Sequence, residues 1–441
     1  MARRRAHLPL DVFLNGRLVG KLTRERTGAI DFRYADAWLE WANAIPVSLS
    51  LPLREDRYIG EPVIAVFDNL LPDHPDIRKR VAERSHAEGT DAYSLLAAIG
   101  RDCVGALQFL PEGAAPDPIG TLKAERLSDK DVAALLGNLG RNPLGVDADR
   151  EFRISLAGAQ EKTALLFWKK KWHLPHGTTP TTHILKPQIG RVPGGMDLSQ
   201  SVENEHLCMR LVKAFGLPTA RTDIKDFGAG NVLVVERFDR LWTKDMRLLR
   251  VPQEDCCQAL GVPPTRKYEA DGGPGIRAIM QLLKGSDAPE EDQRRFFKAQ
   301  IVFWLLAATD GHAKNFSLRL APGGRFALAP LYDVLSTQPL ADARQLSRGR
   351  MRLSMAVGKS RHYAEYAVQP RHYLQTAALC GFPESAVAEI FDELIAEGPL
   401  AIETALSSLP PKFPERLATS IIRGARDRLA TLANERRRTK A

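Results

Sequence analysis

The sequence has few cysteines, no long apolar run and no leader-like beginning. Five of its 441 residues are cysteine and none stands in a C-x-x-C pair, which argues against a disulfide framework or a zinc site. A membrane helix needs about 18 to 20 consecutive apolar residues, whereas the most apolar stretch, 301–308, is typical of a buried helix end. The basic start, Met1–Arg5, is not followed by an apolar segment. We therefore expect a cytoplasmic protein with no membrane partner.

Positive charge is in excess but spread along the chain. The 62 lysines and arginines outnumber the 53 acidic residues, for a net charge of +9. Such an excess favours polyanionic partners through long-range attraction. The clusters 3–5, 169–171 and 436–440 are equally typical of solvated tails and turns. Contact with nucleic acid is therefore permitted but not required.

Residues 1–110 are expected to form a β-rich N-terminal subdomain. Two short apolar runs flank Asn15-Gly16, the dipeptide most typical of a two-residue hairpin turn. Residues 48–52 indicate a short strand, and residues 63–71 a helix that ends before a proline. The following segment, 111–118, is rich in proline, glycine and alanine and indicates a linker.

The next region, 111–240, mixes strands with helices. Ser128 is placed to cap a helix. Residues 163–174 predict a hairpin with a basic turn, and residues 183–186 a short strand stopped by a proline. Residues 198–201 are expected to cap a helix that runs to 215, and residues 232–238 have the β-branched composition of a buried strand. This order differs from the alternating rhythm of a parallel α/β sheet.

The last region, 241–441, is predicted to be mainly helical. Residues 292–308 are apolar on nearly every side, so this helix must be buried. Helical patterns resume near Val368 and are interrupted by prolines between 410 and 414.

Residues 309–316 carry the strongest chemical signal, directly after the buried helix. Asn315 follows Asp310 by five positions, the spacing at which a protein-kinase catalytic loop holds its base and a metal-binding asparagine. The aspartate must accept a hydroxyl proton while the asparagine reaches Mg²⁺ on the phosphates. His312 and Lys314 in this loop are candidates for contact with the γ-phosphate, although both residue types are also ordinary in loops.

Asp333 supports this interpretation. It follows a short apolar strand, 326–328, and stands 23 residues after Asp310. A kinase keeps the Mg²⁺-binding aspartate of its D-F-G motif in this place. An aspartate in a turn after a strand is the plainer alternative, but the ordered set of helix, Asp310, Asn315, strand and Asp333 favours phosphoryl transfer.

A lysine upstream is a candidate phosphate ligand. Lys186 ends the predicted strand 183–186, where a lysine can hold the α- and β-phosphates of ATP. Glu203 and Glu205 in the next helix are both candidates for its carboxylate partner, with a slight preference for Glu205. Acidic residues at the start of a helix also interact with its dipole, so the choice stays open.

Residues 153–162 are a candidate phosphate-covering loop. Small residues at 157–159 allow backbone amides to approach a phosphate. The segment matches neither G-x-x-x-x-G-K-[ST] nor G-x-G-x-x-G, so neither standard nucleotide loop is present. Its place before a hairpin and the strand of Lys186 is that of the loop over the phosphates in a kinase.

Taken together, these motifs resemble the HipA family, the kinase toxins of bacterial toxin–antitoxin pairs. The similar blocks are 155–164 (SLAGAQEKTA), 201–205 (SVENE), 236–240 (ERFDR), 271–275 (DGGPG), 309–315 (TDGHAKN) and 332–333 (YD), in the family's order. The resemblance implies an α+β, two-lobed, protein-kinase-like fold with a β-rich N-terminal lobe and an all-helical C-terminal lobe. It implies a subdomain at 1–110, the nucleotide-binding part of the N-lobe at 111–240, and a kinase lobe with the catalytic loop at 241–441.

The resemblance also implies a role for each candidate residue. Asp310 would be the base, Asn315 and Asp333 the Mg²⁺ ligands, and Lys186 the phosphate-binding lysine. The other residues that would line the ATP site are Ala157, Gly158, Ala159, Gln160, Glu161, Lys162, Glu236, Arg237, Phe238, His312, Lys314 and Tyr332, with 157–162 over the phosphates and 236–238 at the adenine. Ser155 stands where the family's loop serine is autophosphorylated, after which the loop leaves the site and the kinase is silenced.

The implied activity is that of an ATP- and Mg²⁺-dependent serine/threonine protein kinase. Family members phosphorylate aminoacyl-tRNA synthetases, which halts translation and promotes persistence, and they bind a helix-turn-helix antitoxin of the HipB type on operator DNA. Departures from the family pattern lie at 169–171, 186–187 and 344–352. They bear on substrate choice and on contact with DNA rather than on ATP chemistry.

Two other functions stay open from the residues alone. A DNA-binding corepressor with a dispensable or inactive kinase site would account for the net charge. It would leave the ordered set Lys186, Asp310, Asn315 and Asp333 without a purpose. A kinase that acts on lipids or small molecules would share the ATP-binding residues, so only the labelled product separates it from a protein kinase.

Overall fold

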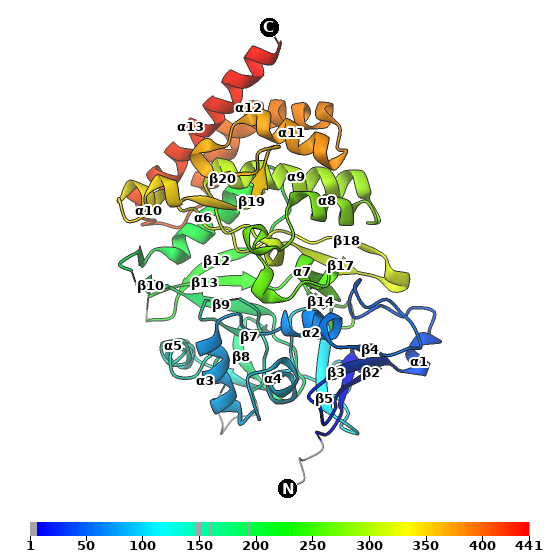
Figure 1. The fold of residues 1–441 in the computed structure, drawn as a ribbon. Coiled ribbons are helices and arrows are strands. Elements are labelled where there is room, and N and C mark those ends of the chain that lie inside the picture. Colours follow the sequence, from blue (N-terminus) through cyan, green and yellow to red (C-terminus); the bar gives the residue numbers. More distant parts are fainter. Residues whose placement is uncertain (1–6, 147–151, 159, 193, 229, 441) are drawn as a thin grey trace. The chain divides into compact units, whose positions relative to one another are not determined.

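The computed structural model describes residues 7–146, 152–158, 160–192, 194–228 and 230–440 (Figure 1). The chain divides into two compact units, each made of several segments. Unit 1 comprises Met1–Pro187, Lys225–Thr265 and Leu318–Phe326, and unit 2 comprises Gln188–Ile224, Arg266–Ser317 and Ala327–Ala441. Lys186 therefore belongs to unit 1, and the catalytic-loop candidate belongs to unit 2.

Unit 1 begins with a five-stranded antiparallel sheet of order β4-β3-β2-β1-β5. Its strands are β1 (Leu10–Leu14), β2 (Arg17–Arg24), β3 (Ile30–Tyr34), β4 (Tyr58–Ile59) and β5 (Leu107–Pro111), with helices α1 (Asp36–Leu39), α2 (Glu61–Asp68), α3 (Pro75–Ser85) and α4 (Ala92–Ile99). The hairpin predicted at Asn15-Gly16 is confirmed, because β1 pairs with β2 and both turn residues have positive φ, 46° and 80°. That backbone matches the twist of the flanking strands.

The strand predicted at residues 48–52 is wrong. Only an isolated bridge joins Ser48 to Leu51. The hydroxyls of Ser48 and Ser50 instead donate to the carbonyl of Gln258, at 3.2 and 2.7 Å. These long-range side-chain bonds hold the segment as a turn rather than in a sheet ladder.

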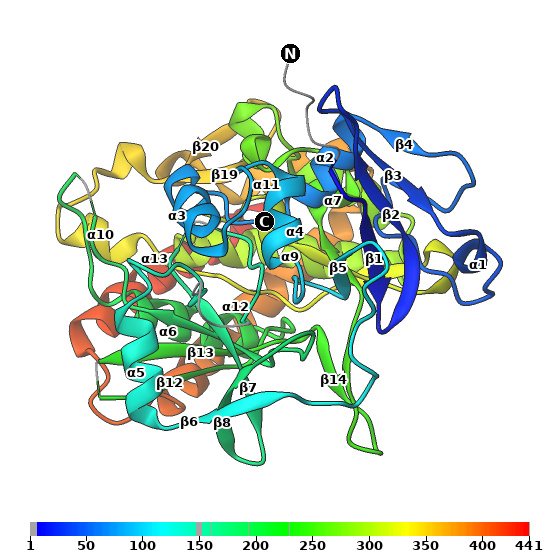
Figure 2. The same cartoon turned by 90° about the horizontal axis from the view of Figure 1, so that it is seen from below.

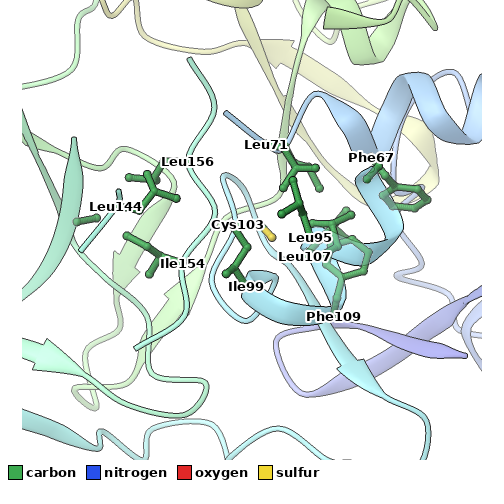
Figure 3. Close-up of a cluster of buried hydrophobic side chains, with 14 of the residues drawn as sticks. Phe67, Leu71, Leu95, Ile99, Cys103, Leu107, Phe109, Leu144, Ile154 and Leu156 are labelled. Carbon is green, nitrogen blue, oxygen red and sulfur yellow. The ribbon is translucent and has the colours of Figure 1, made fainter. Parts of the chain in front are cut away.

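An apolar core joins this sheet to the residues that follow it. Phe67 of α2, Ile99 of α4 and Phe109 of β5 are at most 1% exposed. Figure 3 shows them in one cluster that also contains Ile154 and Leu156, which flank Ser155. The candidate phosphate loop is therefore anchored in the same core as the N-terminal sheet.

The second sheet of unit 1 has the order β12-β13-β9-β7-β8-β6, and the division between the units falls within β12. Its strands are β6 (Ala124–Leu127), β7 (Thr163–Trp168), β8 (Lys171–Pro175), β9 (His183–Pro187), β12 (Thr222–Asp226) and β13 (Asn231–Glu236), preceded by α5 (Asp129–Gly137). The predicted hairpin at 163–174 is confirmed by the pairing of β7 with β8. Ser128 caps α5 as predicted, in a reciprocal capping box with Asp131.

Shorter elements complete this part of the chain. They are the hairpin β14 (Arg240–Trp242) and β15 (Leu248–Arg250), helix α7 (Cys256–Ala259), and the small sheet of β16 (Gln253–Asp255), β17 (Ser317–Leu320) and β18 (Phe326–Leu328). Figure 2 shows the strands of both larger sheets of unit 1 from another side.

A buried cluster of charges lies inside unit 1. Asp102 is paired with Arg240 and Arg250, each at 2.9 Å, and Arg237 is paired with Asp239 at 2.7 Å. Burial by itself would raise the pKa of the Asp102 carboxyl, but the three guanidinium groups hold that pKa well below its usual range. The cluster links the loop after α4 to the segment after β13, and its carboxylates must stay ionised for the fold to be stable.

Unit 2 is mainly helical. Its helices are α6 (Ser201–Ala214), α8 (Ile276–Leu283), α9 (Pro289–Leu306), α10 (Gln338–Asp342), α11 (Pro370–Cys380), α12 (Glu384–Ser407) and α13 (Glu415–Lys440). Helix α9 is the predicted all-round apolar helix, and it packs against α8 and α13 (Figure 1). The α+β class is confirmed, but the lobe expected to be all helical also contains the hairpin β19 (Arg352–Val357) and β20 (His362–Ala364). In β19 every residue from Leu353 to Val357 is buried, and a short apolar run without alternation is hard to recognise as a strand within an arginine-rich segment.

Helix α6 begins differently from the prediction. Its N-cap residue, Gln200, makes no capping bond, and Ser201 already lies in the helix. Instead, the side-chain oxygen of Gln188 accepts from the amide of Val202 at 3.0 Å and from the Ser201 hydroxyl at 3.2 Å. The cap thus comes from a residue beside the two-stranded β10 (Gly190–Arg191) and β11 (Asp197–Leu198).

Among the described residues, no helix is both long and apolar enough to cross a bilayer.

We expect Asp102→Ala to lower the free energy of unfolding by about 3 to 5 kcal/mol, because it leaves buried guanidinium groups uncompensated. Chemical denaturation measures this change. Asp245→Ala, which removes the exposed pair of Asp245 with Arg247, is the matched control and should leave the denaturation midpoint nearly unchanged. Since the pKa of Asp102 is depressed in the folded chain, its contribution is present above about pH 4 and is lost as the pH falls further. Equal stability of the two variants would contradict the importance of the cluster.

Candidate active site

The catalytic-loop candidate starts from the end of α9. Ala307 ends the helix with φ of 49°, in the left-handed region. The amides of Ala307 and Ala308 return to the carbonyls of Trp304 and Phe303, at 3.0 and 2.8 Å. This tight C-terminal cap turns the chain sharply after a helix that is buried from Phe296 to Leu306. Asp310 follows three residues later, on a rigid support.

Residues 310–316 form a closed loop with one accessible carboxylate. The side-chain amide of Asn315 donates to the backbone carbonyl of Asp310 at 2.8 Å, and the amide of His312 donates to the same carbonyl at 2.9 Å. His312, Lys314 and Asn315 are each 5 to 6% exposed, whereas Asp310 is exposed. The five-residue spacing therefore has a local structural basis, since Asn315 closes the loop that presents Asp310.

The segment around Asp333 is fastened to this loop. The hydroxyl of Tyr332 donates to the carbonyl of Lys314 at 2.7 Å and shares a 2.6 Å hydrogen bond with Ser317. Asp333 has φ of 60°, a conformation that non-glycine residues rarely adopt and that often marks functional sites. Unit 2 thus brings Asp310, Lys314, Asn315 and Tyr332 into one hydrogen-bonded group, with Asp333 next in the chain.

Helix α6 holds the other side of the Asp333 segment. Asn204 donates to the carbonyl of Ser336 and accepts from its amide, both at 2.8 Å. The Ser336 hydroxyl donates to the carbonyl of Leu306 at 2.6 Å. Asn204 lies between the two candidate carboxylates Glu203 and Glu205, which are 4% and 2% exposed. Glu203 accepts a hydrogen bond from the Gln188 side chain at 2.8 Å. One of the two candidate partners of Lys186 is therefore already hydrogen-bonded to Gln188.

In unit 1, Lys186 lies on a central strand. It stands opposite Leu233 in the antiparallel pairing of β9 with β13, and it is 6% exposed. Its neighbour Leu185 is fully buried. Since successive side chains of a strand point to opposite faces, Lys186 and Leu185 lie on different faces of the sheet.

The candidate phosphate loop is an extended, buried segment. Ser155 is fully buried, and its hydroxyl donates to the carbonyl of Leu70 at 2.7 Å while its amide donates to the carbonyl of Asp102 at 3.0 Å. The carbonyl of Ala157, two residues after Ser155, accepts from the amine of Lys162 at 2.6 Å. The loop is therefore held by the N-terminal subdomain and by its own lysine.

The remaining loop residues are spread around this anchor. Gly158 has φ of 105° and its carbonyl accepts from the amide of Asp73 at 3.1 Å. The Gln160 side chain donates to the carbonyl of Pro187 at 3.2 Å, and Glu161 pairs with Arg80 at 3.2 Å. Ala159 lies outside the described residues. A β-carbon at Gly158 would lie 2.4 Å from the Lys162 amine, so glycine is what allows lysine and backbone to meet here.

The three hinge candidates have different environments. Glu236, the last residue of β13, is exposed, and Phe238 is half-buried with the guanidinium of Arg319 5.8 Å from its ring centre. The Arg237 side chain instead enters the buried charge cluster and donates to Asp239, Thr181 and the carbonyl of Cys103. The side chain of Arg237 therefore stabilises the fold. Its backbone directly follows the end of β13.

Sequence reasoning missed three residues that organise this site. They are Gln188, Asn204 and Tyr268. The hydroxyl of Tyr268 donates to a carboxylate oxygen of Asp310 at 2.8 Å. Tyr268 stands three positions before the block 271–275, to which the family resemblance assigns no role. Nothing in the sequence links these residues to their partners, which lie from 13 to 132 positions away.

The structure of the whole chain places it in a class. It is similar to a chain in the complex of HipA, HipB and operator DNA from the toxin–antitoxin system of Shewanella oneidensis, with a TM-score of 0.79 and 24% identity, over 96% of this chain and 97% of that one. This likeness defines the fold as HipA-like and kinase-like.

Sequence comparison then gives the family. The profile of the HipA-like C-terminal domain matches residues 154–401, and that of the HipA N-terminal domain matches residues 10–110. Y4mE of Sinorhizobium fredii, named as a candidate kinase, is 37% identical over 81% of this chain and 82% of its own length. The serine/threonine-protein kinase toxin HipA of Shewanella oneidensis is 28% identical over 92% of this chain and 90% of its own. The chain therefore belongs to the HipA family of kinases.

We expect Asn204→Ala to lower the free energy of unfolding by about 1 to 3 kcal/mol, because it leaves the buried amide and carbonyl of Ser336 unpaired. Hydrogen exchange should report faster exchange at Ser336 than in the core of α9. Asn434→Ala, at an exposed position of α13 where the side chain accepts from Arg437, is the control and should change neither quantity. Unchanged exchange at Ser336 would contradict the proposed support of the Asp333 segment by α6.

Proposed function

We propose that this protein is an ATP-dependent serine/threonine protein kinase toxin, which transfers the γ-phosphate of ATP to a protein serine. The observation that carries the proposal is the hydrogen-bonded group of Asp310, Lys314, Asn315 and Tyr332, with Asp333 beside it. A plain loop has no need to bury a lysine and an asparagine next to an exposed aspartate. Membership of the HipA family of kinases supports the same reading.

The residues of unit 2 divide the chemistry among them. Asp310 accepts the proton of the substrate hydroxyl as its oxygen attacks the γ-phosphorus, and the bond from that phosphorus to ADP breaks. The amide oxygen of Asn315 and the carboxylate of Asp333 are hard oxygen donors of the kind that Mg²⁺ prefers. Mg²⁺ on a nucleotide needs only one or two protein ligands because phosphates and waters supply the others. Lys314 and His312 are assigned to the γ-phosphate.

The residues of unit 1 are assigned to the rest of the nucleotide. Lys186 holds the α- and β-phosphates, and Glu203 or Glu205, both of unit 2, is proposed as its carboxylate partner. Residues 157–162 cover the phosphates, and the backbone at 236–238 binds adenine. Because little covalent chemistry falls to the protein in phosphoryl transfer, the rate comes from positioning and from neutralising charge.

The proposed target and partners follow from the family. We assign the protein substrate to the aminoacyl-tRNA synthetases, so that phosphorylation halts translation and promotes persistence. A helix-turn-helix antitoxin of the HipB type is the proposed partner, with operator DNA bound through that complex. The Shewanella oneidensis relative was solved with HipB and operator DNA, and the net charge of +9 suits a complex on DNA.

Ser155 is the proposed off switch. Its hydroxyl is fully buried and bonded to Leu70, and a phosphate there would add about −1.5 to −2 charges. Neither the apolar cluster around Ile154 and Leu156 nor the phosphates of ATP tolerate that charge nearby. A phosphorylated loop is therefore expected to leave its present place and to stop covering ATP.

Asp310→Gln is expected to lower the rate of phosphate transfer from γ-labelled ATP by about 100-fold or more, since it removes the general base. Asp333→Gln should abolish transfer through loss of a Mg²⁺ ligand. Circular dichroism and thermal unfolding should show that both variants remain folded. Glu290→Gln, at an exposed position in the first turn of α9, is the control with wild-type transfer. Wild-type transfer by either aspartate variant would remove the assignment of the site.

Incubation of the protein with Mg·ATP is expected to add one phosphate that maps to Ser155, as read by intact mass and peptide mapping. Ser155→Ala and Asp310→Gln should both abolish this addition, whereas Ser347→Ala, at an exposed serine, should retain it. Limited proteolysis should cut the phosphorylated chain faster between 152 and 162, because the loop has left the core. An active kinase that adds no phosphate to itself would exclude the switch.

A further inference from the structure

A tyrosine outside the catalytic-loop motif contacts the proposed base directly. The hydroxyl of Tyr268 donates to one carboxylate oxygen of Asp310 at 2.8 Å. Its ring meets the ring of His312 edge to face, with centres 5.0 Å apart and planes at 80°. Tyr268 is only half-buried and Asp310 is exposed, so neither general core packing nor charge burial requires this bond.

The backbone around Tyr268 is built to hold that side chain in place. The carbonyl of Tyr268 accepts from the amides of Asp271 and Gly273, at 3.1 and 2.9 Å. A β-carbon at Gly273 would lie 1.9 Å from the carbonyl oxygen of Arg266 and 2.8 Å from that of Tyr268. Only glycine therefore permits the turn to close on Tyr268. The block 271–275 therefore has a structural role, which is to close the turn that holds Tyr268.

Strand β19 joins this turn to the catalytic loop. Glu269, beside Tyr268, accepts from the backbone amide of Ala356 and pairs with Arg361 at 3.1 Å. Two residues earlier on the same strand, the hydroxyl of Ser354 donates to the carbonyl of Thr309 at 2.8 Å. One strand thus fixes the residue after Tyr268 and the residue before Asp310. The distance between phenol and carboxylate is set from both sides.

We propose that Tyr268 is a positioning residue for Asp310, an assignment that rests on the proposed kinase function. The terminal torsion of an aspartate side chain is broad, so an exposed carboxylate rotates freely unless something holds it. A base must lie within hydrogen-bond reach of the hydroxyl from which it takes the proton. The Tyr268 hydroxyl fixes one carboxylate oxygen and thereby aims the other at the substrate serine. Tyr268 transfers no proton in the reaction.

Tyr268→Phe tests this assignment, because it keeps the ring against His312 and removes only the hydroxyl. We expect kcat for phosphate transfer from γ-labelled ATP to fall by about 10- to 100-fold, the effect of losing one hydrogen bond to a charged group. The KM for ATP and the thermal unfolding midpoint should stay at their wild-type values. The KM-against-kcat split separates positioning from a structural role, which would weaken ATP binding and stability together.

Tyr363→Phe is the matched control. Tyr363 is also half-buried in unit 2, and its hydroxyl accepts from the guanidinium of Arg361 at 2.8 Å. The same chemical change there should leave kcat unchanged. An active wild-type enzyme with an equally active Tyr268→Phe variant would overturn the inference alone, as would a variant that loses stability or ATP affinity along with kcat. An inactive wild-type protein would instead overturn the proposed function on which the inference rests.

Discussion

The carboxyl end of helix α9 is the constraint on which the site depends. A helix leaves its last four carbonyls without partners inside the helix, and buried carbonyls must find partners elsewhere. In α9 these are the carbonyls of residues 303–306. Their donors are the amides of Ala308 and Ala307, the guanidinium of Arg428 in α13, and the hydroxyl of Ser336. The hydrogen-bonding needs of one buried helix end therefore bring two distant segments, around Ser336 and Arg428, to the point from which Asp310 projects.

This arrangement explains why the metal-ligand candidate lies where it does. Ser336, which closes α9, is three residues beyond Asp333, and Thr337 adds two further bonds to the carbonyl of Ala307, both at 2.9 Å. Asn204 of α6 then binds both backbone groups of Ser336. These hydrogen bonds hold the segment firmly on both sides. Such firm support allows a non-glycine residue such as Asp333 to keep a positive φ. Local strain at the site is supported by hydrogen bonds several residues away.

Signals that act over a few residues were readable from the sequence. The Asn15-Gly16 hairpin, the Ser128 cap and the hairpin at 163–174 all depend on neighbours within a turn. The pair of Asp310 and Asn315 belongs with them, because Asn315 bonds to the carbonyl of Asp310 itself. Family resemblance extended this reading to the kinase-like fold, which the comparisons confirm.

Signals that act across the fold were not readable. Tyr268 lies 42 residues before its partner Asp310, and Asn204 lies 132 residues before Ser336. Tyrosine and asparagine occur in many surroundings, so neither residue type indicates a distant partner. The error at residues 48–52 has the same origin. The hydroxyls of Ser48 and Ser50 donate to the carbonyl of Gln258, some 210 positions away. These hydrogen bonds hold the segment as a turn instead of a strand.

The anchoring of the phosphate loop has a consequence for regulation. The extended segment 152–157 buries Phe152, Ile154 and Leu156, while Ser155 faces the Leu70 carbonyl. The N-terminal subdomain thus holds this segment through Leu70 and Asp102 at Ser155 and through Asp73 at Gly158. A phosphate on Ser155 has to displace apolar packing as well as a hydrogen bond, so release of the loop and loosening of this core are one event. Contacts made by the N-terminal subdomain therefore set how readily the proposed switch can act, although that subdomain supplies none of the residues assigned to catalysis.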